Sequence, residues 1–210
     1  LTLRFECVLA RAVELAASIT PGRRAAGPKV EQLVTGLLVQ LGMPSAQLRI
    51  EVAPAGELRA DGADLIRFLF TANRNTSLQP IEKVASGGEM SRLMLSLKAL
   101  VAAHAQLPTI IFDEIDTGVS GAIADKMGEI ITNLSGSLQV VNITHLPQVA
   151  SKGDHHFLVY KEETPEGTLS RIRKLSSEAR VAEIAKMLSG SAVTAAATEQ
   201  ARLLLGMEKL

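Results

Sequence analysis

The sequence predicts an α/β fold, and three consecutive segments carry that prediction. The run from Thr109 to Phe112 is short, apolar and rich in β-branched residues, which is typical of a buried parallel strand. A second run of this kind spans Leu138 to Ile143. Between the two runs, apolar residues share one helical face, at Ile123, Met127, Ile130, Ile131 and Leu134. The separation of the two runs is that of one strand–helix–strand unit.

Upstream of this unit, the pattern predicts two helices and then strands. Apolar spacing predicts a first helix from Leu1 to Ile19, which Thr20-Pro21-Gly22 interrupts. Pro28 suits the first turn of a second helix, and Gly42 is placed to end it. Short alternating runs predict strands at residues 48–52, 58–60 and 65–71.

Downstream, the pattern predicts a hairpin followed by two closing helices. Pro147 is expected to end the local structure after the second strand of the unit. Strands are expected at 156–161 and 169–175, and helices at 181–188 and 195–205. Arg171, Arg173 and Lys174 form a small basic cluster, which is more typical of a solvated face than of a DNA contact.

Composition sets the broad class of protein. The chain has 210 residues, of which 47% are hydrophobic, so it can bury a core. Its 22 basic and 22 acidic residues balance, so no overall positive field indicates a nucleic-acid partner. Cys7 is the only cysteine, which excludes an internal disulfide and a thiolate metal cluster. No apolar run in this sequence is long enough to span a membrane, and no signal-peptide pattern appears in it.

The tetrapeptide Ser86-Gly87-Gly88-Glu89 stands immediately before an amphipathic helical pattern. Ser86 and Glu89 have the spacing of a capping box, in which each side chain satisfies a free backbone N–H group. The two glycines let a partner approach the helix N-terminus, whose N–H groups suit a phosphate. A plain helix cap and a phosphate contact both fit these residues. The helical pattern that follows comprises Met90, Leu93, Met94, Leu97, Leu100 and Val101.

Two adjacent carboxylates, Asp113 and Glu114, follow the first predicted strand, where open α/β sheets place their ligands. An apolar strand followed by Asp-Glu is the Walker B pattern, in which the Asp serves Mg²⁺ and the Glu polarises the attacking water. Two solvated acids at the start of a turn are the alternative. His145 follows the second strand, where a histidine is usually a polar loop residue.

Taken together, the order of these motifs resembles the ABC-type ATPase heads of the SMC-like group. Residues 86–89 look like the signature motif, 110–114 like Walker B and 116–121 like the D-loop. His145 looks like the switch histidine. The amino-acid sequences of residues 83–92, 112–121 and 143–150 closely resemble the branch of the SMC-like group that repairs DNA double-strand breaks. The resemblance is specific over about residues 61–160.

The resemblance implies a role for each motif residue. Asp113 would hold Mg²⁺, through water, while Glu114 orients the attacking water and His145 senses the γ-phosphate. Ser86, Gly87, Gly88 and Glu89 would contact ATP held by a second head, and Asp116 would lie at the head–head contact. The implied fold is a head lobe with a mainly parallel sheet flanked by helices. Residues 1–45 would be the end of a coiled coil that returns to the head, and residues 46–210 the ATPase lobe.

The phosphate-binding Gly-x-x-x-x-Gly-Lys-Ser/Thr loop does not occur in this sequence. The resemblance implies that an N-terminal lobe of the same protein supplies it, so this chain is expected to be a fragment that is incomplete by itself. The implied partners are that lobe, a second identical head, and DNA bound through other parts or a local basic patch, in the bacterial cytoplasm at the nucleoid. The alternatives are a non-hydrolysing dimerisation lobe and the head of another chromosome-maintenance ATPase.

Overall fold

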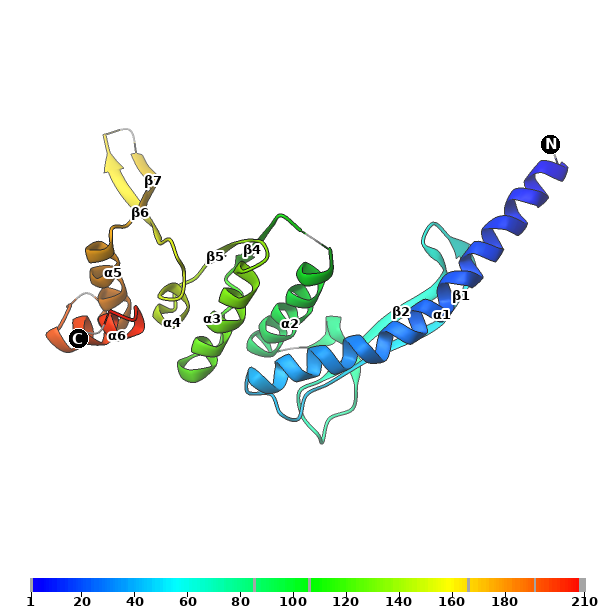
Figure 1. Cartoon of the computed structure of the whole chain (residues 1–210), viewed down its shortest axis with the longest axis horizontal. Helices are drawn as coiled ribbons and strands as arrows, with labels where there is room; N and C mark the ends of the chain where they lie inside the picture. Colours follow the sequence, from blue (N-terminus) through cyan, green and yellow to red (C-terminus); the bar gives the residue numbers. More distant parts are fainter. Residues whose placement is uncertain (1, 85, 106, 166, 191, 208–210) are drawn as a thin grey trace. The chain divides into compact units, whose positions relative to one another are not determined.

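The computed structural model describes residues 2–84, 86–105, 107–165, 167–190 and 192–207, which fall into two compact units. The first unit spans residues 1–100 and the second residues 101–210 (Figure 1). The helices are α1 (Thr2–Gln40), α2 (Gly87–Ala105), α3 (Gly121–Ser135), α4 (Pro147–Ala150), α5 (Ser177–Ser189) and α6 (Ala195–Leu204), with a 3₁₀ turn at Ile81–Lys83. The strands are β1 (Gln47–Arg59), β2 (Gly62–Thr71), β3 (Gln79–Pro80), β4 (Thr109–Asp113), β5 (Gln139–Ile143), β6 (Phe157–Thr164) and β7 (Gly167–Lys174).

The N-terminal region is one continuous helix of 39 residues, α1, and the predicted interruption at residues 20–22 is wrong. Pro21 and Pro28 both lie inside it. A proline inside a helix frees the carbonyl four residues earlier, here those of Ala17 and Arg24. All four of these residues are exposed, so water can satisfy the freed carbonyls. Contacts with the neighbouring sheet on both sides of Pro21 and Pro28 hold the helix together.

A buried carboxylate on β2 provides the first of these contacts. Asp64 accepts hydrogen bonds from the Thr20 hydroxyl (2.9 Å) and from the Arg23 guanidinium (3.0 Å). Burial by itself would raise the pKa of Asp64, but these hydrogen bonds and the charges of Arg23 and Arg24 outweigh it, and the pKa is lowered. Further along α1, Glu31 accepts from the backbone N–H of Ile50 on β1 at 2.7 Å. The helix is therefore attached to the β1–β2 pair at two places along its length.

Gly42 ends α1, as the sequence predicts, through a Schellman turn. Its φ of 76° lies in the left-handed region that suits glycine. The N–H of Met43 donates to the carbonyl of Leu38 at 2.9 Å, and the N–H of Gly42 donates to that of Val39 at 3.1 Å. These are the two hydrogen bonds that define this motif. The turn brings the chain back so that β1 runs beside the helix.

The core of the first unit joins the end of α1, the sheet and the start of α2. In the sheet, β2 pairs antiparallel with both β1 and β3. The buried cluster draws on all three parts and comprises Val34, Leu38, Met43, Ala46, Leu48, Phe70 and Leu93. The N-terminal half of α1, in contrast, exposes Leu3, Phe5, Val8, Leu9 and Val13.

The second unit contains the predicted strand–helix–strand element. β4 and β5 pair parallel, with Asp113 opposite Ile143, and α3 contacts β5. The buried residues of α3 are Ala124, Met127, Gly128, Ile130 and Ile131, close to the predicted face. Among the described residues this is the one parallel pair, so the expectation of a mainly parallel sheet is wrong. The other strands are joined by short connections, and such connections allow only antiparallel pairing.

The chain closes with a hairpin and a helix pair. β6 and β7 pair antiparallel, and α5 and α6 pack through Ile184, Ala185 and Ala201. Pro147 begins the short helix α4 instead of ending the local structure, because proline fits the first helical turn, where no N–H partner is needed. Within the part of the chain that the structure describes, no helix combines the length and apolar character needed to cross a membrane.

Candidate active site

The parallel pair brings three predicted site residues to one edge of its sheet. Asp113 is the last residue of β4, Glu114 follows it, and His145 comes two residues after the end of β5. Since parallel strands end on the same side, these three side chains share the carboxyl edge, where α/β sheets bind ligands. All three are exposed to solvent. The structure thus gathers the acidic pair and the histidine, as the sequence predicts.

Glu114 has an unusual backbone conformation. Its φ is +48°, which makes it the one described residue other than glycine with positive φ. Its N–H donates to the carbonyl of Ile143 at 3.1 Å, so the pairing with β5 continues one residue beyond β4. Its carbonyl accepts from the N–H (3.2 Å) and the hydroxyl (2.8 Å) of Thr117. Left-handed backbone at a non-glycine residue is costly and is concentrated at functional sites.

Asp116 differs from its neighbours because it is completely buried. Its Oδ2 accepts a hydrogen bond from the hydroxyl of Thr144, the residue before His145. The carboxylate therefore faces the inside of its own unit. Whether this residue also takes part in a head–head contact stays a prediction.

The signature-like segment lies in the other unit, at the start of α2. The N–H of Met90 donates to the carbonyl of Ser86 at 3.0 Å, which makes Ser86 the N-cap in backbone terms. Ser86 and Gly87 are exposed, and a Cβ added to Gly87 would meet no atom within 4 Å. The space beside this helix N-terminus is open, as phosphate contact requires.

Arg92 fixes the first turn of α2 to the end of α1. Its Nε donates to the carbonyl of Gly88 at 2.9 Å, and its Nη1 donates to the carbonyl of Leu41 at 3.1 Å. One guanidinium thus joins a signature glycine to the helix that precedes the sheet. Sequence analysis missed this residue, although its position four residues after Gly88, on the same helical face, was a usable signal.

The carboxylates at the edge fit a magnesium ion held together with a nucleotide. No group of three or more His, Cys, Asp or Glu side chains that could hold a metal occurs within the described ranges. Mg²⁺ is usually held by one or two carboxylates, several waters and substrate phosphates, and not by an all-protein cage. Asp113 and Glu114 supply suitable oxygen donors, and both are open to solvent.

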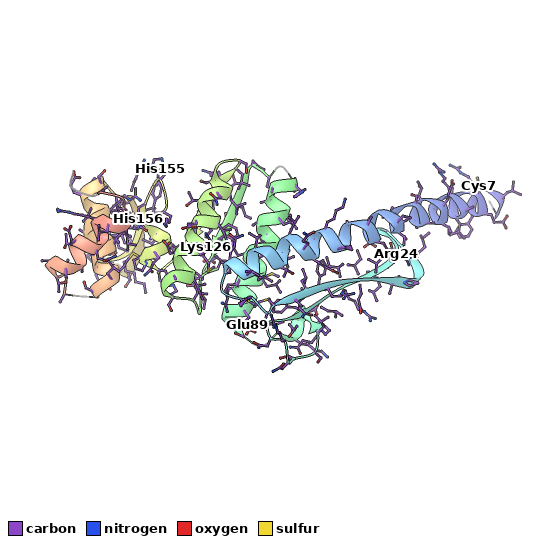
Figure 2. The ribbon with its side chains drawn as sticks, turned by 60° about the horizontal axis from the view of Figure 1, so that its bottom comes forward. Cys7, Arg24, Glu89, Lys126, His155 and His156 are labelled. Carbon is purple, nitrogen blue, oxygen red and sulfur yellow. The ribbon has the colours of Figure 1, made fainter. Side chains whose placement is uncertain are left out.

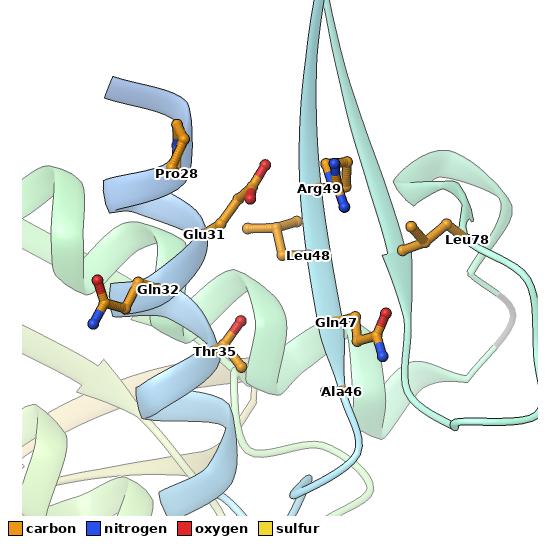
Figure 3. A pocket seen from close by; sticks show the side chains of 9 residues that line it. All are labelled: Pro28, Glu31, Gln32, Thr35, Ala46, Gln47, Leu48, Arg49 and Leu78. Atoms are coloured by element: carbon orange, nitrogen blue, oxygen red, sulfur yellow. The ribbon is translucent and has the colours of Figure 1, made fainter. Parts of the chain in front are cut away.

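A groove with a volume of about 400 Å³ lies elsewhere in the first unit, between α1 and β1 (Figure 3). Glu31 and Arg49 bring opposite charges to it. The complete lining is Pro28, Glu31, Gln32, Thr35, Ala46, Gln47, Leu48, Arg49 and Leu78. None of the predicted site residues belongs to this lining, so the groove supports no role in the proposed chemistry.

The other polar residues noted in the sequence make contacts within the hairpin or lie at or near the surface. Arg171 pairs with Glu162 at 2.8 Å, and the Arg173 guanidinium lies 5.5 Å from the Tyr160 ring centroid. His155 is exposed, whereas His156 is half-buried. Figure 2 labels both residues. Burial lowers the pKa of His156, and the positive charge of Arg180 acts in the same direction, against Glu183. Cys7 is an exposed free thiol on α1.

The chain is similar in sequence to DNA repair proteins called RecN. RecN of Rickettsia bellii (strain RML369-C) is 40% identical over 192 residues, which cover 91% of this chain and 35% of that protein. RecN of Vibrio cholerae is 39% identical over 178 residues, covering 84% and 32%. RecN of Bacillus subtilis (strain 168) is 43% identical over 149 residues, covering 71% and 26%. No family model matches the chain.

The fold is similar to that of SMC head domains. The Smc head domain with a coiled coil and joint from Pyrococcus yayanosii has a TM-score of 0.58 at 21% identity, and the match covers 74% of this chain and 28% of that one. A second structure comes from work on the ATP-driven dimerization and DNA stimulated activation of SMC ATPases, and its TM-score is 0.54 at 16% identity. This match covers 78% of the present chain and 93% of the other one. The chain has an SMC-head-like fold and is homologous to the RecN DNA repair proteins over about a third of their length.

Proposed function

We propose that this chain is the signature and Walker B part of a head that binds and hydrolyses ATP between paired heads in DNA double-strand break repair. The observation that carries the proposal is the geometry at the end of β4. Glu114 holds a costly positive φ while hydrogen bonded to Ile143, so an acidic residue is kept at a fixed place on the carboxyl edge. A solvated turn could place glycine at such a position without this steric cost.

Each residue at the edge has one role in this proposal. Asp113 helps hold Mg²⁺ through water, and Glu114 orients the attacking water for transfer of a phosphoryl group. His145 contacts the γ-phosphate from the neighbouring strand end. When bound, Mg²⁺ would supply neutralisation of the charge on the phosphate oxygens. Because this chemistry depends on positioning and electrostatics, fixed backbone at Glu114 contributes directly to it.

The signature segment is proposed to act on ATP bound by a second, identical head. Ser86, Gly87 and Gly88 would cap the γ-phosphate there, with Glu89 in the first turn of α2. The open space at Gly87 supports this role. A related SMC ATPase is described in terms of ATP-driven dimerization, which is consistent with sites shared between heads. Asp116 is proposed to lie near the head–head contact.

The remaining partners are an N-terminal lobe of the same protein and DNA. That lobe would supply the phosphate-binding loop that this sequence does not contain. One face of the β4–β5 pair exposes Ile111, Val141 and Ile143, and parallel strands are normally covered on both faces. The N-terminal lobe is a fitting cover for it. DNA would bind through other parts or a local basic patch, at the nucleoid in the bacterial cytoplasm.

The test of the catalytic role is Glu114→Gln in the full-length protein. The amide keeps the shape of the side chain but loses the charge that orients water, so hydrolysis should nearly stop while ATP binding persists. Heads should also accumulate as ATP-bound pairs, which light scattering can measure. Glu163→Gln, an exposed substitution of the same kind on β6, is the control. Turnover near the parental rate in Glu114→Gln would remove Glu114 from catalysis.

The shared-site arrangement is tested by mixing two inactive full-length variants. Ser86→Arg should block phosphate approach by its bulk, and the second variant has its Walker A lysine replaced. A mixed pair contains one intact site and one doubly damaged site, so partial ATPase activity should return. Continued inactivity after demonstrated subunit exchange would contradict a signature that acts on the partner's nucleotide.

A further inference from the structure

We propose that Thr144 and Asp116 are positioning residues that hold the His145 segment against the Glu114 turn. This inference rests on the proposed ATPase function and adds two residues to it. Neither residue would touch nucleotide in this role. Their task is to fix the distance between the residue that orients water and the residue that contacts the γ-phosphate.

The hydroxyl of Thr144 both donates and accepts a hydrogen bond. Its oxygen accepts a hydrogen bond from the N–H of Leu146 at 3.0 Å, and its proton is donated to Oδ2 of Asp116. A hydroxyl has a single proton, so acceptance from Leu146 and donation to Asp116 determine its orientation. In the chain, His145 lies between Thr144, which carries this hydroxyl, and Leu146, whose N–H donates to it. The backbone on both sides of the imidazole is therefore tied to Asp116.

The Glu114 turn is tied to the same strand by a second contact. The N–H of Glu114 donates to the carbonyl of Ile143, the residue before Thr144. Asp116 lies within the turn, where its carbonyl accepts from the N–H of Val119 at 3.3 Å. Two adjacent residues of the β5 end thus hold two residues of the β4 turn. A double connection restricts both the separation and the relative rotation of the two segments.

The burial of Asp116 makes this connection persistent. Its exposed fraction is 0%, and its Oδ1 has no hydrogen-bond partner within the described residues. The bond from Thr144 is then its main compensation for burial, because the carboxylate has no surface exposed to bulk solvent. If Thr144 moved away, a buried polar group would lose its partner. The cost of that loss keeps the His145 segment in place.

The test compares Thr144→Val with Thr144→Ser in the full-length protein. Valine has nearly the shape of threonine but neither donates nor accepts, whereas serine keeps the hydroxyl. Thr144→Val should lower kcat for ATP by about 10- to 100-fold, the effect of a small misplacement of catalytic groups. KM for ATP should change much less than kcat, because loss of the His145 contact removes only one of the groups proposed to hold ATP. Thr144→Ser should restore most of kcat, which a purely steric role of the side chain would not explain.

A second variant protects the test against simple loss of folding. Asp116→Leu combined with Thr144→Val replaces both polar partners with apolar groups of similar size, a change that proteins often tolerate. The double variant should keep its melting temperature yet show the low kcat of Thr144→Val. Parental kcat in a folded double variant would overturn the positioning role.

A readout independent of ATP hydrolysis separates this inference from the proposed function. Hydrogen exchange at the Leu146 amide should become about 5-fold faster in Thr144→Val, since the amide loses its acceptor, and should be parental in Thr144→Ser. Unchanged exchange in Thr144→Val would overturn the inference even if Glu114→Gln abolishes turnover. Conversely, normal turnover in Glu114→Gln would contradict the proposed catalytic role of Glu114. The positioning role of Thr144 and Asp116 would then be overturned as well, because it presumes that Glu114 is catalytic.

Discussion

Glu114→Gly should stabilise the protein while it removes the carboxylate proposed to orient water. The φ of +48° places Glu114 in the left-handed region, where an L-residue with a Cβ is strained. This conformation costs about 1–2 kcal/mol for such residues and almost nothing for glycine. Glycine loses more backbone entropy on folding, by about 0.5–1 kcal/mol. The net expectation is a gain of about 0.5–1 kcal/mol in the free energy of unfolding.

The matched control is Glu114→Ala. The side chain of Glu114 is exposed and its known bonds are made by the backbone, so its removal costs little. Alanine keeps the Cβ and hence the strain. The difference between the glycine and alanine variants therefore isolates the backbone contribution.

Urea titration with equal m-values, supported by melting curves, measures this difference. For a protein of this size, about 1 kcal/mol corresponds to a shift of about 2–4 °C in the melting temperature. Equal stability of the glycine and alanine variants would refute the predicted net gain, because any strain at residue 114 would then only offset the entropy cost of glycine. A gain in stability coupled to loss of turnover would show that strain is retained there for function.

Substitutions at four further residues test the first unit. Gly42→Ala should cost about 1 kcal/mol in urea titrations because of its positive φ, whereas Gly36→Ala, in an open helix interior, should stabilise by a similar amount. Asp64, whose pKa is lowered, contributes stability above pH 4 or so that is lost as pH falls through its folded pKa. Asp64→Asn should therefore flatten the acid limb of a stability–pH curve; an unchanged limb would contradict this. Arg92→Met should cost about 1–3 kcal/mol, and Arg92→Lys should recover only part, since an ammonium does not reproduce the two-way guanidinium contact.

Local sequence patterns predicted the elements whose signals lie within a few residues. The strand–helix–strand unit, the end of α1 at Gly42 and the start of α2 after Ser86 all follow the sequence closely. Proline was the misleading signal. Its penalty in a helix is local, and exposed carbonyls together with the bonds from Thr20 and Arg23 to Asp64 outweigh it in α1. The mainly parallel sheet implied by the resemblance was wrong, because short connections join the strands outside the β4–β5 pair and allow only antiparallel pairing.

By itself, the sequence determined the chemical groups of the site and their order along the chain. Asp113, Glu114 and His145 follow strands, and parallel pairing alone is enough to place strand ends on one edge. Only the tertiary structure decided that Asp116 turns inward to Thr144 and that Arg92 joins Gly88 to Leu41. Those contacts link residues 28 and 51 positions apart. No local pattern encodes such pairs, because burial and hydrogen-bond satisfaction arise only when distant segments pack together.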